Sequence, residues 1–170
     1  MRKTAALNSN ELYAMIDAAE VNNRFFTCHL NRRRDKDYCI VKKVIDDNMI
    51  GIPFFIESRV QGGNGIPSDR RRSKKHGGGM LLDWGVHLID QILMMVNSNV
   101  VQIYSQIINI HYDVDDNLKV YLKFDNGINA LLEVSTTCFQ PLPRWHIMGS
   151  EGTLSIIDKN CAGAIGTVNN

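Results

Sequence analysis

The sequence lacks several features that would assign it at once to a class of protein. Its 170 residues contain no apolar run of the roughly 18 residues that a membrane-spanning helix needs, and no long apolar stretch near the amino terminus like that of a signal peptide. Nineteen Lys and Arg against eighteen Asp and Glu leave a net charge of +1, which argues against nucleic acid as the main partner. Because 44% of the residues are hydrophobic, a disordered protein is excluded, and we expect one soluble, cytoplasmic domain with an adequate core.

Closely spaced cysteines are also lacking. Zinc sites and thioredoxin-type redox centres need two thiols close in sequence or a matching pair of histidines, and the sequence has neither. We therefore expect no metal site, and we expect the cysteines to be buried or half-buried free thiols. They are Cys28, Cys39, Cys138 and Cys161.

The first half of the chain has the pattern of helices separated by short strands. Asn8 and Glu11 have the spacing of a capping box, and apolar residues follow at helical intervals. Gly51 falls where a left-handed residue ends a helix. The predicted elements are a helix over about 10–21, a short buried strand over 25–30, a second helix after Asp35 and a strand after Pro53.

The second half has the pattern of an antiparallel sheet. Apolar and polar residues alternate over 118–124, and Asp125-Asn126-Gly127 is a strong hairpin turn signal because Asn and Gly accept positive φ. Strands are predicted over about 100–110, 118–124, 128–138, 145–148 and 153–157, without crossover helices between them. The predicted fold class is α+β, with an open, mainly antiparallel β-sheet and helices packed on one face. Apolar residues on the other face favour a homodimer that forms through the sheet.

Residues 61–78 break every periodicity, and an irregular segment of this length is usually a functional or a disordered loop. Five cations lie among the six residues Arg70–Lys75. Such a run is most often a solvated, mobile tip, and the alternative is contact with a phosphate of a cofactor or a substrate. Aromatic residues do not alternate with these charges, so a nucleic-acid site is not supported.

The segment Gly77–Asp90 carries the main candidate chemistry. A regular helix would place Asp83, His87 and Asp90 together, opposite a broad apolar face. Gly85 costs helix stability, which suggests that something approaches the backbone there. The helix start behind three glycines would offer N–H groups to an anion. Two alternatives stay open, an ordinary amphipathic helix and a metal-dependent enzyme that uses Asp83 and His87.

Gly77–Asp90 resembles the Gly-Gly-Gly…Asp-x-Gly-x-His-x-x-Asp segment of the glucose–fructose oxidoreductase/inositol dehydrogenase (Gfo/Idh/MocA) family. Further motifs of that family agree in order over nearly the whole chain. Lys3 with the following helix resembles its Glu-Lys-Pro segment, Asn31-Arg32-Arg33 resembles its Arg-bearing turn, and Gly149–Leu154 is similar to its Gly-x-x-Gly-x-Leu turn.

The resemblance implies an NAD- or NADP-dependent oxidoreductase that acts on a sugar, a cyclitol or a related polyol. In that family a dinucleotide-binding domain comes first, and the α+β domain binds substrate and often dimerises. By motif, His87 is the general acid/base, Asp83 binds or orients the substrate, and Lys3 contacts both the reacting hydroxyl and the cofactor. Arg32 and Asp90 are further substrate-binding candidates. A base with a pKa near 7 suits the removal of a hydroxyl proton.

The sequence departs from the family pattern at two places. Arg2-Lys3-Thr4 stands where the family has Glu-Lys-Pro, and the chain lacks the strand, Gly-rich turn and helix of a dinucleotide site. We therefore expect residues 1–170 to be a single substrate-binding and dimerisation domain, truncated at both ends, that binds no cofactor and is inactive alone. The alternative is a stand-alone, non-catalytic module that binds a sugar or a protein.

Overall fold

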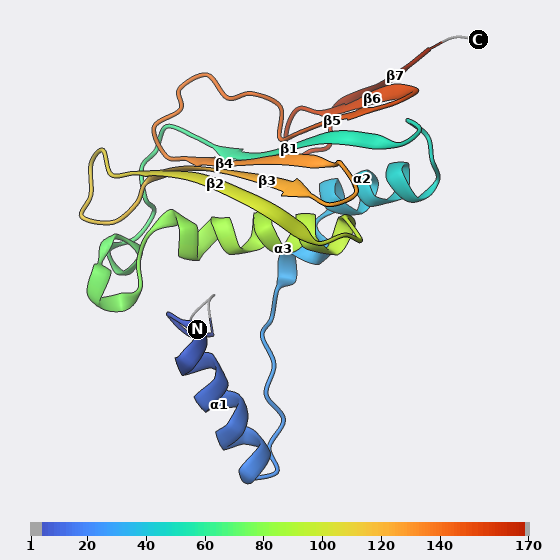
Figure 1. The fold of residues 1–170 in the computed structure, drawn as a ribbon. Helices are drawn as coiled ribbons and strands as arrows, with labels where there is room; N and C mark the ends of the chain where they lie inside the picture. Colours follow the sequence, from blue (N-terminus) through green and yellow to red (C-terminus); the bar gives the residue numbers. More distant parts are fainter. Residues whose placement is uncertain (1–4, 169–170) are drawn as a thin grey trace.

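The sheet is the centre of the fold. The computed structural model describes residues 5–168, and seven strands in this range form one sheet in the order β2-β3-β4-β1-β5-β6-β7 (Figure 1). The strands are β1 (Pro53–Gln61), β2 (Val100–Ile108), β3 (Asn117–Phe124), β4 (Asn129–Ser135), β5 (Trp145–Gly149), β6 (Gly152–Ile156) and β7 (Gly163–Thr167). β7 was not predicted from the sequence. The other strands lie close to their predicted ranges.

The order of the strands explains why the sheet is only mainly antiparallel. β3 and β4 pair antiparallel through the predicted hairpin, in which Gly127 has φ +89°. β1 lies in the middle of the sheet, parallel to β4 and antiparallel to β5. The remaining neighbours pair antiparallel. The predicted fold class is therefore confirmed, with β1 inserted between β4 and β5.

Helices cover one face of the sheet. α2 and α3 lie against that face, whereas α1 lies away from the sheet at the end of an extended segment (Figure 1). The helices are α1 (Ser9–Val21), α2 (Lys36–Asp46) and α3 (Val86–Met95), and α3 continues the π-helical turn η4 (Leu81–Gly85). Three short 3₁₀ turns complete the described part: η1 (Asn31–Arg34), η2 (Asp69–Arg72) and η3 (Lys74–His76).

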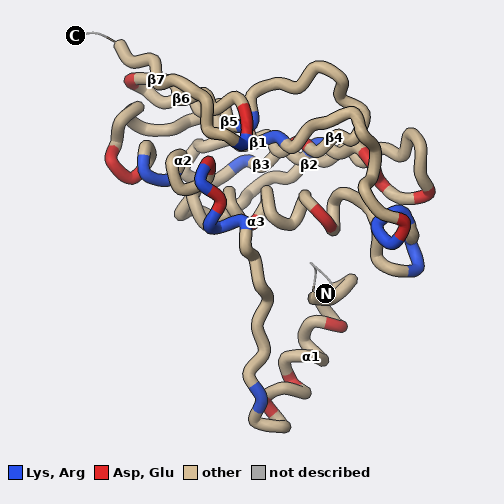
Figure 2. The backbone as a smooth tube through the Cα atoms, turned by 180° about the vertical axis from the view of Figure 1, so that it is seen from behind, with Lys and Arg blue, Asp and Glu red and all other residues tan. Residues whose placement is uncertain are grey.

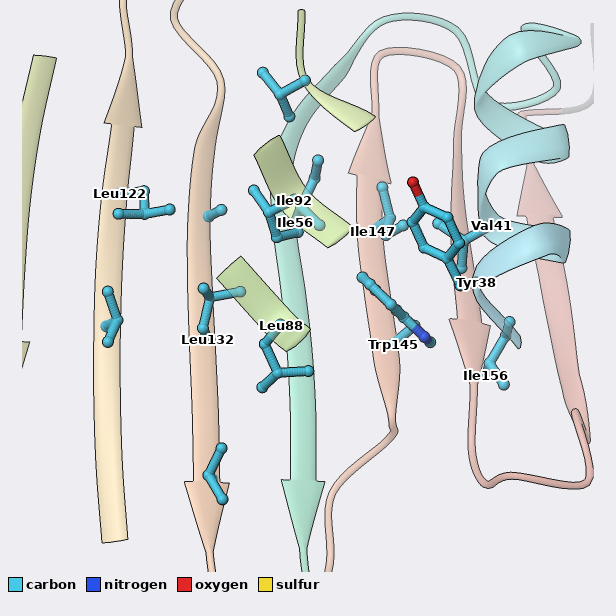
Figure 3. Close-up of a cluster of buried hydrophobic side chains, with 14 of the residues drawn as sticks. Tyr38, Val41, Ile56, Leu88, Ile92, Leu122, Leu132, Trp145, Ile147 and Ile156 are labelled. Atoms are coloured by element: carbon cyan, nitrogen blue, oxygen red, sulfur yellow. The ribbon is translucent and has the colours of Figure 1, made fainter. Parts of the chain in front are cut away.

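The core lies between α2, α3 and the covered face of the sheet (Figure 3). Alternate residues of β3 and β4 point into it, which gives both strands a strict period-two burial pattern. Leu88 and Ile92 of α3 are fully buried against β1 and β4, and Trp145 of β5 packs beside Tyr38 of α2, with ring centroids 6.4 Å apart. This layer fixes the position of α3, which carries the candidate site.

The amino-terminal segment packs differently from what its sequence pattern predicts. α1 and its capping box are confirmed, because the Asn8 side chain accepts from Glu11 N at 2.9 Å. Within Ser9–Val21, however, no side chain is buried. Residues 24–30 are extended but not part of the sheet, and Phe25 is 92% exposed, so the predicted buried strand is wrong. A strand needs a neighbour to satisfy its backbone groups, and the described residues supply none here.

The helices and the cysteines can be compared with what the composition predicts. In the described range 5–168, no helix is long and apolar enough to cross a membrane. The four cysteines are free thiols, two of them exposed and two half-buried. The expectation of buried or half-buried thiols is therefore wrong for Cys28 and Cys39, which lie on the extended segment and on the outer side of α2.

Candidate functional site

The candidate site is built around an irregular turn at the start of α3. Residues Leu81–Gly85 form a π-helical turn in which Val86 N donates to Leu81 O. Because a π turn inserts an extra residue, it rotates the side chains that precede it relative to the helix that follows. Gly85 lies where this turn approaches the sheet: a Cβ there would be 3.0 Å from Leu81 Cδ1 and 3.8 Å from Leu118 Cδ2. The group that approaches the Gly85 backbone is thus the chain's own core.

The two principal candidates do not lie on the face that the sequence pattern predicts. Asp83 and His87 are 6% and 1% exposed, so they lie on the buried side of the turn. The regular-helix prediction, which placed both opposite the apolar face, is therefore wrong. Within α3, His87 shares the buried face with Leu88 and Ile92, whereas Leu93 is 48% exposed. Burial of a carboxylate and an imidazole requires partners inside the protein, and both side chains have them.

The glycine run before the turn has a structural role. Gly79 has φ +108°, and a Cβ at this position would collide with the carboxylate of Asp115. That carboxylate accepts from Leu81 N at 2.6 Å, and Asp115 O accepts from Met80 N at 2.9 Å. The predicted anion site at this helix start is therefore filled by Asp115, whose negative charge lies at the positive end of the helical turns.

The basic loop before α3 reaches the site. Arg71 Nε lies 3.1 Å from Asp83 Oδ2 in an ion pair whose carboxylate is 7% exposed. Arg72 donates to Ile66 O at 2.9 and 2.6 Å, and its guanidinium lies 5.2 Å from the centroid of the Tyr112 ring. The prediction of a solvated tip therefore holds for Arg72, which is exposed, and fails for Arg71, which is half-buried beside Asp83. The remaining cations of the run stand on the two short turns of this loop (Figure 2).

A half-buried tryptophan joins the candidates to two cations. Trp84 meets the His87 ring edge-on, with centroids 6.1 Å apart and planes at 72°. The Arg32 guanidinium lies 4.4 Å from the Trp84 ring centroid, and Lys159 Nζ lies 5.4 Å from it. Arg32 also pairs with Asp35 at 3.1 Å. The structure thus brings Arg32 and His87 to the same tryptophan, beside Asp83.

Asp90, another predicted site residue, has a different partner from this group. Asp90 accepts two hydrogen bonds from Arg33, at 2.8 and 2.6 Å, and this bidentate pair joins α3 to η1. The hydrogen bond to Asp90 raises the pKa of the Arg33 guanidinium. Lys3 lies outside the described residues. Its predicted contact with the reacting hydroxyl and the cofactor stays a prediction.

A buried polar network supports the site from beneath. Arg144, which directly precedes β5, pairs with Asp37 of α2 through Nε at 3.1 Å, and donates to Ser58 Oγ at 2.6 Å and to Gln91 Oε1 at 3.2 Å. Gln91 of α3 in turn donates to Arg32 O at 2.7 Å. Burial lowers the pKa of Arg144 to about 10, although Asp37 opposes this shift, so the guanidinium is charged at neutral pH.

Three residues of this arrangement were not singled out from the sequence as part of the site. Trp84 lies inside the family-like segment three residues before His87, and this spacing on a helix could have indicated it. Arg71 belongs to the basic run, whose contact partner the sequence does not identify. Lys159 comes from the turn between β6 and β7, about 75 residues away, and no local pattern connects it with Trp84.

The described residues do not fit a nicotinamide dinucleotide. Such a cofactor needs a strand, a Gly-rich turn and a helix whose N–H groups face the pyrophosphate. In the range 5–168, β1 is followed by a long loop, and the N–H groups of Gly78 and Gly79 donate to carbonyls of Ser73 and Arg71. Within the same range, no three His, Cys, Asp or Glu side chains gather as metal ligands would.

The chain is similar to a known family of proteins and to several of its members. The model of the GFO/IDH/MocA C-terminal domain matches residues 38–155. A crystal structure of an NAD-binding protein from Listeria innocua is similar over 96% of this chain and 47% of that one, with 46% identity and a TM-score of 0.92. A trans-1,2-dihydrobenzene-1,2-diol dehydrogenase of Danio rerio is 29% identical over 157 residues, which are 91% of this chain and 46% of the relative. The chain therefore spans about half the length of these relatives.

Proposed function

The chain belongs to the GFO/IDH/MocA family, of which it contains the C-terminal domain, and from this premise we propose that it forms the substrate-binding half of an NAD(P)-dependent oxidoreductase. The proposed substrate is a sugar, a cyclitol or a related polyol. The family is supported by the match over 38–155, and the cofactor by the description of the Listeria innocua relative as NAD-binding.

The observation that carries this proposal is the position of Asp83 on the π-helical turn and of His87 in the first turn of α3, beside an aromatic ring and several cations. A carboxylate and an imidazole that lie one turn apart can hydrogen bond to neighbouring hydroxyls of a polyol. π turns are frequent at functional sites because they present side chains that a regular helix would place elsewhere.

Each residue has a proposed task. His87 takes up or returns the proton of the reacting hydroxyl, since an imidazole exchanges a proton readily near neutral pH. Asp83 accepts a hydrogen bond from a substrate hydroxyl and orients it, and Arg32 holds Trp84 in place beside the pair. Asp90 contributes indirectly, because its pair with Arg33 fixes α3 to η1.

The dinucleotide has no cradle in residues 5–168, so we propose that the chain by itself binds neither NADH nor NADPH and is inactive alone. In the active protein, other residues would hold the cofactor. Titration of the chain with each nucleotide, followed by nucleotide fluorescence, tests this part. Saturable binding with micromolar affinity would refute it.

Binding of a polyol can be measured directly because the two tryptophans report different environments. Trp84 lies in the site, whereas the Trp145 indole donates to Asp37 Oδ2 at 3.0 Å inside the core. Titration of the ¹⁵N-labelled chain with sorbitol should move the Trp84 indole resonance and leave the Trp145 resonance in place. Asp83→Asn should weaken binding about tenfold, because the amide loses the charge that strengthens a hydrogen bond from a hydroxyl.

A control for this titration is Asp47→Asn, which changes an exposed carboxylate that pairs with Lys43 on α2. It should leave sorbitol binding unchanged. If Asp83→Asn binds sorbitol as the parent chain does, and circular dichroism shows that it is folded, Asp83 is not part of the polyol site. A shift of both indole resonances to the same extent would indicate a general change of structure instead.

The second part of the proposal is a homodimer through the open face of the sheet. Among residues 5–168, helices cover one face only (Figure 1), and the other face carries Tyr104, which is 66% exposed, beside Phe55 and Tyr121. Lys119 and Glu133 on the same face are oppositely charged, so two copies can meet across a two-fold axis without net repulsion.

Light scattering coupled to gel filtration tests the dimer. The parent chain should elute at twice the chain mass, and Tyr104→Asp should convert it to a monomer because it places a charge in the apolar contact. Tyr13→Asp on α1, where the tyrosine is 63% exposed, is the matched control and should remain dimeric. If the parent chain is monomeric at a concentration of about 100 µM, the dissociation constant is too high for a stable dimer, and this part of the proposal is wrong.

A further inference from the structure

The turn between β6 and β7 presents a lysine to the candidate site. Asp158 O accepts from Cys161 N at 3.1 Å, which closes a turn with Lys159 near its tip. Asp158 Oδ1 accepts from Asn160 N at 2.9 Å, so the neighbouring carboxylate is directed into the turn. The backbone of this turn is thus fixed by its own hydrogen bonds, and Lys159 Nζ lies 5.4 Å from the Trp84 ring centroid.

Lys159 differs in its partners from the other cations of this region. Arg32 pairs with Asp35, Arg33 with Asp90, and Arg71 with Asp83, each at 3.1 Å or less. In the part of the chain that the structure describes, Lys159 forms no ion pair. Its ammonium contacts the face of Trp84, and a cation–π contact at an exposed position leaves the charge available to an anion.

The basic loop on the other side of the site adds to this positive charge. Arg70, Lys74 and Lys75 stand on η2 and η3, close in sequence to Arg71 (Figure 2). Asp69 is the acidic residue of this loop, and it pairs with Arg72. Lys159 and the basic loop therefore both bring positive charge to the candidate site, which raises the local concentration of a small anion.

From this distribution of charge we propose that the site takes a polyol that carries a carboxylate, and that Lys159 pairs with the carboxylate. The inference rests on the proposed function, in which Asp83 and His87 bind the hydroxyl groups. Lys159 then selects an acid over the corresponding neutral alcohol. Trp84 supplies an apolar surface for the carbon chain between the two ends, as aromatic rings do for C–H groups of polyols.

Two probes with the same carbon chain test this inference. Gluconate and sorbitol both have six carbons, but gluconate carries a carboxylate at the end where sorbitol carries an alcohol. At constant ionic strength, gluconate should move the Trp84 indole resonance with about fivefold tighter affinity than sorbitol, the gain expected from one exposed ion pair. Lys159→Gln should abolish this preference, whereas Lys159→Arg should retain it because the charge is kept.

A matched control is Lys123→Gln on β3, an exposed lysine on the opposite face of the sheet, which should leave the preference intact. Raising the salt concentration should reduce the preference for gluconate and leave sorbitol binding unchanged, because only the ion pair is screened. Acetate is the third probe, since it carries the charge without the hydroxyl groups. It should bind at least tenfold more weakly than gluconate.

The outcomes separate this inference from the proposed function. Equal affinity for gluconate and sorbitol would overturn the role of Lys159 and leave the polyol site standing. Acetate as strong as gluconate would show an anion site without polyol recognition, which contradicts the proposed function. Absence of binding by both six-carbon probes would overturn both. If NADPH moves the Trp84 resonance at a lower concentration than gluconate does, the positive charge serves a dinucleotide, and the inference is wrong.

Discussion

The buried ion pair between Asp37 and Arg144 provides the sharpest test of how this domain is held together. The two side chains are 6% and 7% exposed, and Asp37 accepts from both Arg144 Nε and the indole of Trp145. We consider the substitution Asp37→Asn, which preserves the size of the side chain and removes its charge. Asparagine can still accept one hydrogen bond, but Arg144 then lies in the core without a counter-ion.

The expected cost follows from the burial of Arg144. Removing one partner of a buried ion pair typically destabilises a protein by about 3–5 kcal/mol, because the remaining charge is uncompensated. The pKa of Arg144 is already lowered by burial to about 10 with Asp37 present, which shows that its charged form is disfavoured at this place. Against a total stability of about 5–15 kcal/mol, the loss of about 3 kcal/mol is large.

The assay is equilibrium unfolding in urea at pH 7, followed by circular dichroism. With a slope of about 2 kcal/mol per molar urea, the midpoint should fall by about 1.5 M. Asp46→Asn is the matched control, because Asp46 pairs with Lys42 on the exposed side of α2. It should change stability by less than about 0.5 kcal/mol. A loss below about 1 kcal/mol for Asp37→Asn would refute the reasoning, since the pair would then contribute no more than a surface contact.

Two further substitutions test the loops around the site. Burial raises the pKa of Asp116, but the hydrogen bonds that Asp116 accepts from His111 N and Ile110 N outweigh burial, so the pKa is lowered overall. The carboxylate therefore stabilises the fold above about pH 4, and this contribution is lost as the pH falls further. Asp116→Asn should therefore cost about 1–2 kcal/mol at pH 7 and flatten the acid limb of the stability profile between pH 4 and 2, measured by thermal melts; an unchanged acid limb would contradict this assignment. Gly79→Ala should lower the urea midpoint by about 1 M, because Gly79 has φ +108° and an added Cβ would collide with the Asp115 carboxylate. An unchanged midpoint would show that this turn can relax.

Local sequence patterns were sufficient to predict the strands that bury one face. The alternation in β3 and β4 and the turn at Gly127 are confirmed, because period-two burial is visible in the sequence itself. α1 and its cap at Asn8 are likewise confirmed. The strand predicted over 25–30 is wrong because its apolar residues indicate burial without indicating what buries them. β7, with two glycines among its five residues, carries too weak a pattern to be predicted.

The site residues stay a prediction, whereas the predicted orientation of Asp83 and His87 is wrong. The segment containing Asp83 and His87 was recognised by its resemblance to a family. The spacing of apolar residues then indicated the wrong buried face, because His87 and Gln91 of α3 are buried whereas Leu93 is exposed. The π turn at Leu81–Gly85 has no signal in the sequence either. The contacts of Arg71 and Lys159 join segments far apart in the chain. Such contacts depend on tertiary packing, which local periodicity does not describe.

The core network and the site share α3, and this connection leads to a last prediction. Gln91 bonds both to Arg144 in the core and to Arg32 O on η1, while the Arg32 guanidinium lies 4.4 Å from the Trp84 ring centroid. A change at Asp37 should therefore reach Trp84 through Arg144, Gln91 and Arg32.

In the folded Asp37→Asn variant, without any ligand, we expect the Trp84 indole resonance to shift as well as that of Trp145, which loses its charged acceptor. Asp46→Asn, which alters the exposed side of the same helix, should leave both resonances in place. A shift confined to Trp145 would show that α3 keeps its position without the buried pair. Stability and the geometry of the site would then be set independently, and the Arg33–Asp90 pair would be sufficient to hold η1 against α3.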